Sequence, residues 1–256
     1  MYQWRLLGFS PGDPYWNMAV DEAILESCRT GITPNTLRIY TWQPSAVSIG
    51  RHQAIREEVD LDIADNLGIN VVRRISGGGA VFHDCHGEVT YSIVVNEKLV
   101  SEVSGPTVFF RLAQGISLAL SKFGLPSEEE KIHCPSIFVG RKKISGNAQA
   151  RKDGMILQHG TILLSYDPEI MYSVLKVKEG RTKRKMVQSV FQHVTTLERE
   201  LGYIPKQETV AEYLVEGFQK SLGIVLKEET PSEEEIVLAT KLREEKYLSP
   251  KWTFKY

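Results

Sequence analysis

The chain has 256 residues, 42% hydrophobic and 25% charged, an ordinary globular composition that allows a substantial core. Its 31 basic and 32 acidic residues give a net charge of −1, so no overall field favours nucleic acid or an anionic membrane as a partner. Three cysteines are too few for a disulfide framework, and we find neither a signal peptide nor an apolar run long enough to span a bilayer; we therefore expect a cytoplasmic protein.

The sequence predicts short strands combined with a few long helices. Asp13 and Pro14 favour the start of a helix that runs to about Ser27, and Val103–Phe123 has the spacing of a long amphipathic helix. Apolar runs bounded by turn residues predict strands between and after these helices. The expected strands are Thr36–Tyr40, Ala46–Ile49, Asn70–Arg73, Ala80–His83, Glu88–Asn96, Ser136–Val139, Lys143–Ala148 and Met155–Leu164.

From about residue 168 the chain is predicted to be mostly helical and to pack back onto the sheet. A basic run over residues 176–185 and an acidic run over residues 227–235 are expected to be solvated faces. The whole pattern predicts one α+β domain over residues 1–256, with a mixed sheet flanked by helices.

A glycine-rich loop is the first of three segments whose residues suit chemistry. Gly77, Gly78 and Gly79 follow two arginines and lie between strand-like runs. Glycines let the backbone pass close to a ligand and leave N–H groups free to point at negative oxygens. The spacing fits neither a P-loop nor a dinucleotide fingerprint, and a plain tight turn is the commoner interpretation of such a loop taken alone.

The second segment centres on the ammonium group of Lys143, and the third on the imidazole of His159. Lys143 is followed by small residues on an expected strand, where its ammonium could project into a site with little steric cover; a lysine-rich surface hairpin is the alternative. His159 and Gly160 open an apolar strand, and a single histidine there is more often structural.

Taken in order, the three segments resemble one known family. They are similar to motifs of the lipoate-protein ligase A and octanoyltransferase family, which shares its catalytic fold with biotin protein ligases. The similar runs are Arg73-Arg74, Gly77-Gly78-Gly79-Ala80-Val81-Phe82-His83-Asp84, Lys143-Ile144-Ser145-Gly146-Asn147-Ala148-Gln149 and Gln158-His159-Gly160. The resemblance implies a biotin/lipoyl protein ligase-like catalytic domain. It also implies a pocket for an eight-carbon acyl group, walled in part by small residues near Val72, Ala80 and Gly146–Ala148. The implied acyl-binding residues are Arg73, Gly77, Gly78, Gly79, His83, Gly146, Ala148, His159 and Gly160.

The family holds two chemistries. Its ligases use ATP and Mg²⁺ to make lipoyl-AMP and then transfer lipoate to a carrier lysine, whereas its octanoyltransferases take octanoyl from acyl carrier protein, in several branches through a cysteine thioester. Cys134 lies nine residues before Lys143, where the resemblance to LipM-type transferases places the cysteine, and no acid of the ligase kind lies between them. We therefore expect an octanoyltransferase that needs no cofactor, with an ATP- and Mg²⁺-dependent lipoate-protein ligase as the alternative.

Cys134 and Lys143 are the expected catalytic residues. A thiol attacks as the thiolate, and Lys143 could stabilise both that thiolate and the oxyanion of the tetrahedral intermediate. A buried, inert Cys134 and a nucleophilic Cys85, beside His83 and His86, stay open as alternatives, and Cys28 is expected in the core. The spacing of the cysteines and histidines is poor for zinc, so no metal site is expected.

The resemblance also implies the partners. The donor would be octanoyl-acyl carrier protein, and the acceptor would be the lysine of a lipoyl-carrier domain such as the glycine cleavage H protein. A non-enzymatic, biotin-ligase-like regulatory module is the remaining alternative. It would need a DNA-reading element or a basic face, and the near-zero net charge and the lack of a helix-turn-helix signal count against it.

Overall fold

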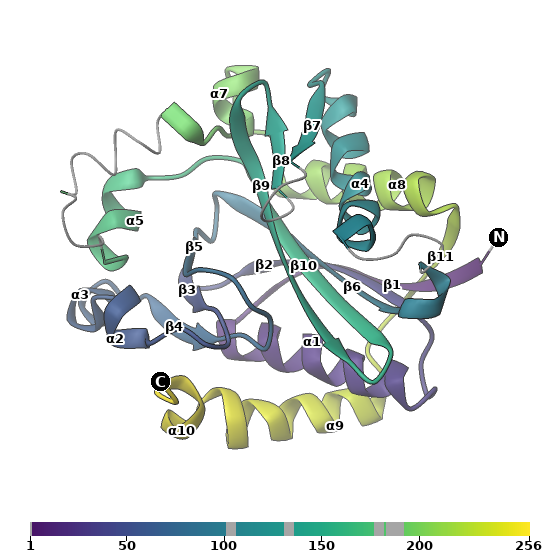
Figure 1. Cartoon of the computed structure of the whole chain (residues 1–256), viewed down its shortest axis with the longest axis horizontal. Coiled ribbons are helices and arrows are strands. Elements are labelled where there is room, and N and C mark those ends of the chain that lie inside the picture. The colour runs from purple at the N-terminus through teal and green to yellow at the C-terminus, as the bar shows by residue number, and fades with distance from the viewer. Residues whose placement is uncertain (1, 101–105, 131–135, 177–181, 183–191) are drawn as a thin grey trace.

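The computed structural model describes residues 2–100, 106–130, 136–176, 182 and 192–256 (Figure 1). The strands are β1 (Tyr2–Gly12), β2 (Thr36–Trp42), β3 (Ala46–Ile49), β4 (Asn70–Arg73), β5 (Val81–His83), β6 (Glu88–Asn96), β7 (Ser127–Glu130), β8 (Ser136–Val139), β9 (Lys142–Lys152), β10 (Met155–Leu163) and β11 (Ile224–Glu229). The α-helices are α1 (Pro14–Arg29), α2 (Ile55–Glu58), α3 (Leu61–Asn66), α4 (Pro106–Lys122), α5 (Pro168–Val174), α7 (Leu197–Leu201), α8 (Gln207–Leu222), α9 (Glu233–Leu242) and α10 (Pro250–Thr253). A 3₁₀ turn at Glu97–Leu99 and a π-helical segment at Arg243–Tyr247 complete these elements.

A large mixed sheet forms the centre of the molecule, which confirms the predicted α+β class. Its strand order is β11-β1-β2-β6-β10-β9-β8-β7, with β1 parallel to both of its neighbours and the other pairs antiparallel. In Figure 1, α4 and α8 cover one side of this sheet, and α1 and α9 lie on the other. The sheet is therefore buried between two layers of helix.

The alternation of β6 sorts its side chains between these two layers. Val89, Tyr91 and Ile93 enter the apolar core that includes α4 and α8. Thr90 and Ser92 point the other way, as successive residues of a strand must, and both are buried. The strand thereby places hydroxyl groups on the side of the sheet where α1 packs.

A second, three-stranded sheet of order β4-β3-β5 lies beside the first. It shares a separate apolar core with α2, α3 and α5, which includes Val47, Ile55, Phe82 and Val174. Because β5 leads into the turn before β6, the small sheet is tied directly to the centre of the large one. The glycine loop joins β4 to β5 along this junction.

Several local predictions are confirmed. Asp13 caps α1 by accepting hydrogen bonds from the N–H groups of Tyr15 and Trp16. Four strands have the predicted bounds, namely Ala46–Ile49, Asn70–Arg73, Glu88–Asn96 and Ser136–Val139. In the described part of the chain, no helix has the length and apolar character needed to cross a membrane.

Other predictions need correction. The C-terminal part contains a strand, β11, which pairs in parallel with β1, and the sequence predicted neither of them. The acidic run is not wholly solvated, because Glu235 is buried and its carboxylate accepts hydrogen bonds of 2.6 and 2.7 Å from Arg5. Most of the basic run, and residues 103–105 of the predicted helix, lie outside the described residues.

Candidate functional site

A cavity of about 500 Å³ lies between the two sheets, within the range of roughly 300–1,000 Å³ that is typical of small-molecule pockets. Gly78 and Gly79 of the glycine loop, Lys143 of β9, and His159 and Gly160 of β10 all line it. Three segments that are far apart in the sequence therefore meet at one place, as the sequence predicted.

Other predicted site residues divide between the cavity and its surroundings. His83, Gly146 and Ala148 line the cavity, whereas Gly77 is not among its lining residues. Of the expected walls, Ala80 and the residues 146–148 contribute, but Val72 does not.

Arg73 requires a correction, because it does not line the cavity. It is fully buried, and its guanidinium donates hydrogen bonds to the backbone carbonyls of Gly50, Gln53, Trp252 and Thr253. These bonds tie the end of β4 to the C-terminal turn. The neighbouring arginine, at position 74, lines the cavity instead.

The three cysteines differ in what the structure says of them. Cys134 lies outside the described residues. Cys28 is partly buried and packs against the apolar core around α1, its thiol donates to the carbonyl of Pro34, and burial raises the pKa of that thiol. Cys85 is partly buried and does not line the cavity. In the described ranges, no group of three or more histidine, cysteine or acidic side chains is placed to hold a metal ion.

The ammonium of Lys143 lies directly over Gly146. A methyl group built on Gly146 would be 2.9 Å from the Lys143 Nζ atom, so the absence of a side chain there makes room for the ammonium. The backbone at Lys143 pairs with Phe138 of β8, and its carbonyl accepts a hydrogen bond from the N–H of Thr195. A cation is thus fixed at the wall of the cavity.

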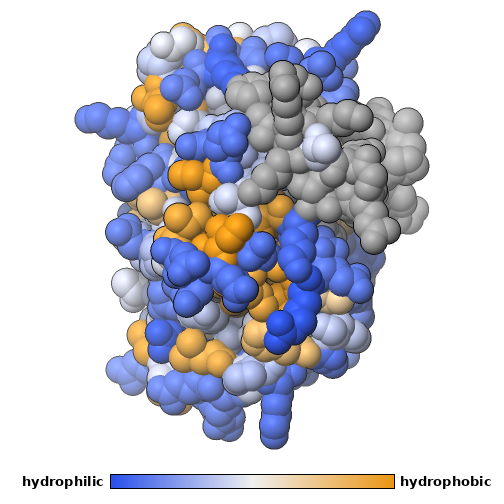
Figure 2. Space-filling view, turned by 90° about the vertical axis from the view of Figure 1, so that its left-hand side faces the viewer, coloured by the Kyte–Doolittle hydropathy of each residue, from blue (hydrophilic) through white to orange (hydrophobic). Residues whose placement is uncertain are grey.

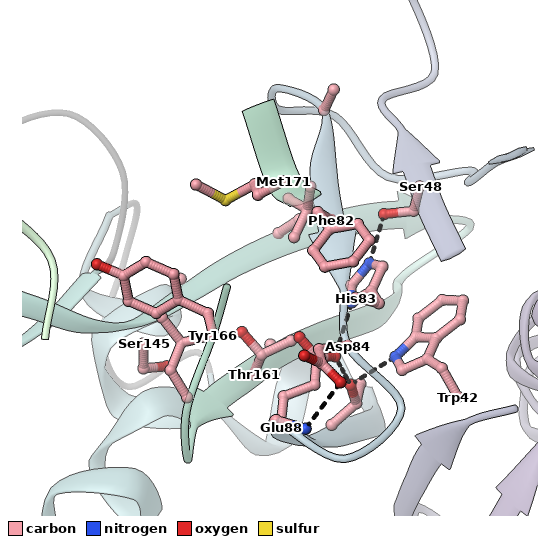
Figure 3. A pocket seen from close by; sticks show the side chains of 18 of the residues that line it. Trp42, Ser48, Phe82, His83, Asp84, Glu88, Ser145, Thr161, Tyr166 and Met171 are labelled. Atoms are coloured by element: carbon pink, nitrogen blue, oxygen red, sulfur yellow. Dashed lines mark hydrogen bonds and ion pairs between the residues drawn. The ribbon is translucent and has the colours of Figure 1, made fainter. Parts of the chain in front are cut away.

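Apolar and aromatic side chains form much of the remaining wall. Met18, Trp42, Phe82 and Met171 line the cavity from four different elements, and Figure 3 shows Phe82 and Met171 above His83, with Trp42 to one side. Apolar residues also gather in the middle of the molecular face that carries α3 and α5 (Figure 2). The cavity can therefore accept an apolar group beside a small number of polar atoms.

A buried arginine organises the polar side of the cavity. Arg74 donates to the hydroxyl groups of Ser48 and Ser76 at 3.0 and 3.1 Å, and to the carbonyls of Gly77 and Gly79 at 2.8 and 2.7 Å. Burial lowers the pKa of its guanidinium to about 10. This arginine holds the glycine loop in place and carries a positive charge beside the cavity.

One histidine connects Arg74 to helix α1. The Ser76 hydroxyl lies 2.6 Å from His159 Nε2, and His159 Nδ1 lies 3.4 Å from the Asp21 carboxylate. Burial lowers the pKa of His159. Burial also acts to raise the pKa of Asp21, but the hydrogen bond from His159 and the charge of Arg38 hold it below its usual value.

A second histidine forms a similar arrangement on β5. His83 Nε2 lies 2.8 Å from the Ser48 hydroxyl, and His83 Nδ1 lies 2.7 Å from the Glu88 carboxylate (Figure 3). The Trp42 ring stacks on the imidazole, with the ring centroids 4.0 Å apart. Both histidines are thus held between a serine and an acid.

The sequence analysis did not select the buried polar partners of these histidines. They are Asp21, Ser48, Arg74, Ser76 and Glu88. A usable signal was present, because each is a polar residue within or beside an otherwise apolar helix or strand, and buried polar groups are normally hydrogen-bonded.

Comparison with known proteins places this geometry in context. The family model of the lipoyl protein ligase A/B catalytic domain matches residues 13–219. Octanoyltransferase LipM of Brevibacillus brevis is 36% identical over 278 residues, with all of both chains covered. Octanoyltransferase LipM of Moorella thermoacetica is also 36% identical, over 86% of this chain and 87% of its own.

Solved structures give a related result. A structure of the bi-partite lipoate protein ligase and its E2 lipoyl domain from Thermoplasma acidophilum matches with a TM-score of 0.88 and 32% identity, over 99% of this chain and 97% of that one. A lipoate-protein ligase A bound with ATP matches with a TM-score of 0.85 and 30% identity, over 98% of each chain.

Proposed function

Because the chain belongs to the lipoyl protein ligase A/B catalytic-domain family, we propose that it is an octanoyltransferase of the LipM type that acts in protein lipoylation. The observation that carries this choice within the family is the 36% identity to octanoyltransferase LipM over the whole of both chains. The reaction moves an octanoyl group onto a carrier lysine, in the cytoplasm and without ATP.

The apolar cavity supports this substrate. Burying a methylene group contributes about 0.8 kcal/mol, so the six methylenes of an octanoyl chain would contribute about 5 kcal/mol. Met18, Trp42 and Ala148 line the cavity and offer apolar surface to such a chain. Lys143 would then lie at the polar end, where the thioester carbonyl must be.

Cys134 is the proposed nucleophile. In the first step its thiolate attacks the carbonyl carbon of the donor thioester, and the thiolate of the donor leaves. Ser136, two residues later, pairs with Gly146, the residue beneath the Lys143 ammonium. Two residues of extended chain span at most about 7 Å, so this short separation supports a role for Cys134 next to that cation.

The proposed partners are two carrier proteins. Octanoyl-acyl carrier protein would supply the acyl group, and a lipoyl-carrier domain or glycine cleavage H protein would accept it. The Thermoplasma acidophilum relative, whose structure was determined together with an E2 lipoyl domain, supports an acceptor of this kind.

An ATP-dependent lipoate-protein ligase is the second candidate. The similarity to two lipoate-protein ligase structures, with TM-scores of 0.88 and 0.85, favours it. Such an enzyme would require ATP and Mg²⁺ and would make lipoyl-AMP before transfer.

A transfer assay separates the two candidates. Purified chain is mixed with octanoyl-acyl carrier protein and a lipoyl domain, with and without ATP and Mg²⁺, and octanoylation of the domain is followed by mass spectrometry. Transfer without ATP supports the transferase. Transfer from free octanoate or lipoate that requires ATP, with none from the acyl carrier protein, would overturn it. Lys143→Ala should lose most of this transfer, and Lys220→Ala, at an exposed position, is the matched control.

A further inference from the structure

The direction of every hydrogen bond around Arg74 follows from its chemistry, because a guanidinium can only donate. The hydroxyl oxygens of Ser48 and Ser76 accept from it, so their own hydrogens are free to point onward. Each hydrogen meets an imidazole Nε2, at His83 and at His159. With each hydroxyl donating in this way, the imidazole proton lies on Nδ1, which faces an acid in both cases.

Two chains of hydrogen bonds, here called arms, therefore start at Arg74, and they differ at their ends. The first arm runs through Ser76 and His159 to Asp21. The Asp21 carboxylate accepts from Arg38 and Ser92 at Oδ1, and from Tyr40 and His159 at Oδ2. Both oxygens have partners, and Arg38 balances the charge. This arm is a complete structural network.

The second arm ends at Glu88 and is incomplete. The Trp42 indole, another group that can only donate, gives its hydrogen to Thr90, so Thr90 must donate in turn to Glu88 Oε1 at 3.0 Å. His83 donates to the same oxygen at 2.7 Å. Glu88 Oε2 has no hydrogen-bond partner among the described residues, although Glu88 is only 1% exposed.

A buried carboxylate oxygen without a donor is costly, because the group has lost its hydration and gained no hydrogen bond in exchange. Gln207 of α8 donates to the backbone carbonyls of Cys85 and Glu88 and holds the backbone of the turn, while His83 and Thr90 hold the Glu88 side chain at Oε1. Glu88 lines the same cavity as Lys143. The arrangement suits a ligand that brings a positive, hydrogen-bonding group into the cavity.

We propose that Glu88 is a further catalytic residue, whose Oε2 binds the ε-ammonium of the acceptor lysine and accepts a proton as the amide forms; this rests on the function proposed above. Among the groups that take part in the reaction, the lysine ammonium is the one whose positive charge matches a carboxylate. The Ser145 hydroxyl also lines the cavity without a hydrogen-bond partner among the described residues, but it is neutral and suits a carbonyl oxygen.

The reaction needs such an acceptor. A free lysine has a pKa of about 10.4 and arrives as ammonium at neutral pH. After it loses one proton to water, its nitrogen lone pair attacks the carbonyl carbon of the enzyme thioester, and the carbonyl π pair moves to oxygen. Glu88 Oε2 takes a second proton from the new C–N⁺ centre, the oxyanion re-forms the carbonyl, and the cysteine thiolate leaves. The proton on Glu88 then passes to that thiolate or to solvent.

The other polar groups that line the cavity are less suited to this task. Lys143 is itself a cation and stabilises negative charge. His83 Nε2 is already hydrogen-bonded to Ser48, and His159 Nε2 to Ser76. The Asp84 carboxylate accepts from two backbone N–H groups at Oδ1, and it is partly exposed, so water can reach it, unlike Glu88.

The test separates loading of the enzyme from release to the acceptor. Glu88→Gln keeps one carbonyl oxygen for His83 and Thr90 and replaces only Oε2 by an amide. Loading with octanoyl-acyl carrier protein, read as a mass gain, tests the proposed function alone and should equal the wild type. Release of octanoyl to a lipoyl domain should be slower by a factor of at least about 100, the usual loss of a general base. The exposed Glu212→Gln is the matched control.

Two further measurements exclude a structural explanation. Hydroxylamine is a neutral nucleophile that loses its proton readily to water, so it should discharge octanoyl from Glu88→Gln as fast as from the wild type. Glu88→Asp, which retains a carboxylate, should recover part of the release to lysine. Release to the lipoyl domain at the wild-type rate in Glu88→Gln, or an equal loss with hydroxylamine, would overturn the proposal.

Discussion

Gly146→Ala tests the position of the Lys143 ammonium without touching the lysine itself. The added methyl group would lie 2.9 Å from Lys143 Nζ and 3.0 Å from its Cε. Carbon atoms in good contact are about 3.5–4.0 Å apart, so the ammonium must retreat by about 0.6 Å. The obstacle is the flexible end of a side chain, so the strand itself can remain in place.

The size of the effect follows from this displacement. A misplacement of about 1 Å can cost roughly 100-fold in rate, so about 0.6 Å should cost roughly tenfold. Complete removal of the ammonium in Lys143→Ala should cost on the order of 10² to 10³, as for the loss of one oxyanion donor. The free energy of unfolding of Gly146→Ala should be unchanged, or up to about 1 kcal/mol higher, because alanine restricts the unfolded chain.

A double-mutant cycle makes the assay specific. Single-turnover octanoyl transfer is measured for the wild type, Gly146→Ala, Lys143→Ala and the double variant, and urea unfolding checks the stability of each. If Gly146→Ala acts through the ammonium, it should change the rate little once Lys143 is gone. A full tenfold loss in both backgrounds, or wild-type activity in Gly146→Ala alone, would refute this reasoning.

Three other predictions concern stability. Gly160→Ala should lower the free energy of unfolding by roughly 1–3 kcal/mol in urea, because its methyl group would lie 2.0 Å from Asn147 Oδ1; an unchanged midpoint would contradict the packing of β9 on β10. Burial lowers the pKa of His159, so the unfolded chain takes up a proton that the folded chain resists, and stability should be lost as pH falls below about 6.5. Urea unfolding at several pH values should show that His159→Asn loses less stability at low pH than the wild type. An equal loss in both proteins would contradict the role of His159 in this pH dependence. Glu235→Ala should cost about 3–5 kcal/mol, because Arg5 would remain as an unpaired buried charge, and a loss below 1 kcal/mol would refute that assignment.

Elements with a strong local signal could be predicted from the sequence. Ala46–Ile49 and Glu88–Asn96 are apolar runs between turn residues, and both have the predicted bounds. β7 and β11 are the two edges of the large sheet and carry charged residues, as edge strands often do, so their sequences lack an apolar pattern. β1 is defined by its pairing with β2 and β11, which no local window contains.

The candidate site shows a similar division. The resemblance to a family selected the glycine loop, Lys143 and His159, and the structure brings them to one cavity. It did not separate Arg73 from Arg74, because consecutive residues at a strand end point to opposite sides, and only the fold decides which side is the cavity. Glu88 was seen only as part of a strand, since its importance depends on His83 of β5 and on Thr90, which itself accepts from Trp42 of β2.

The central claim is that the chain carries the acyl group itself, on Cys134. Intact-mass measurement after mixing with octanoyl-acyl carrier protein, in the absence of ATP, tests this most directly. The account predicts a gain of one octanoyl group, removed by hydroxylamine, absent in Cys134→Ser and retained in Cys85→Ser and Cys28→Ser. No mass gain in the wild type, together with ATP-dependent transfer that survives Cys134→Ser, would contradict it.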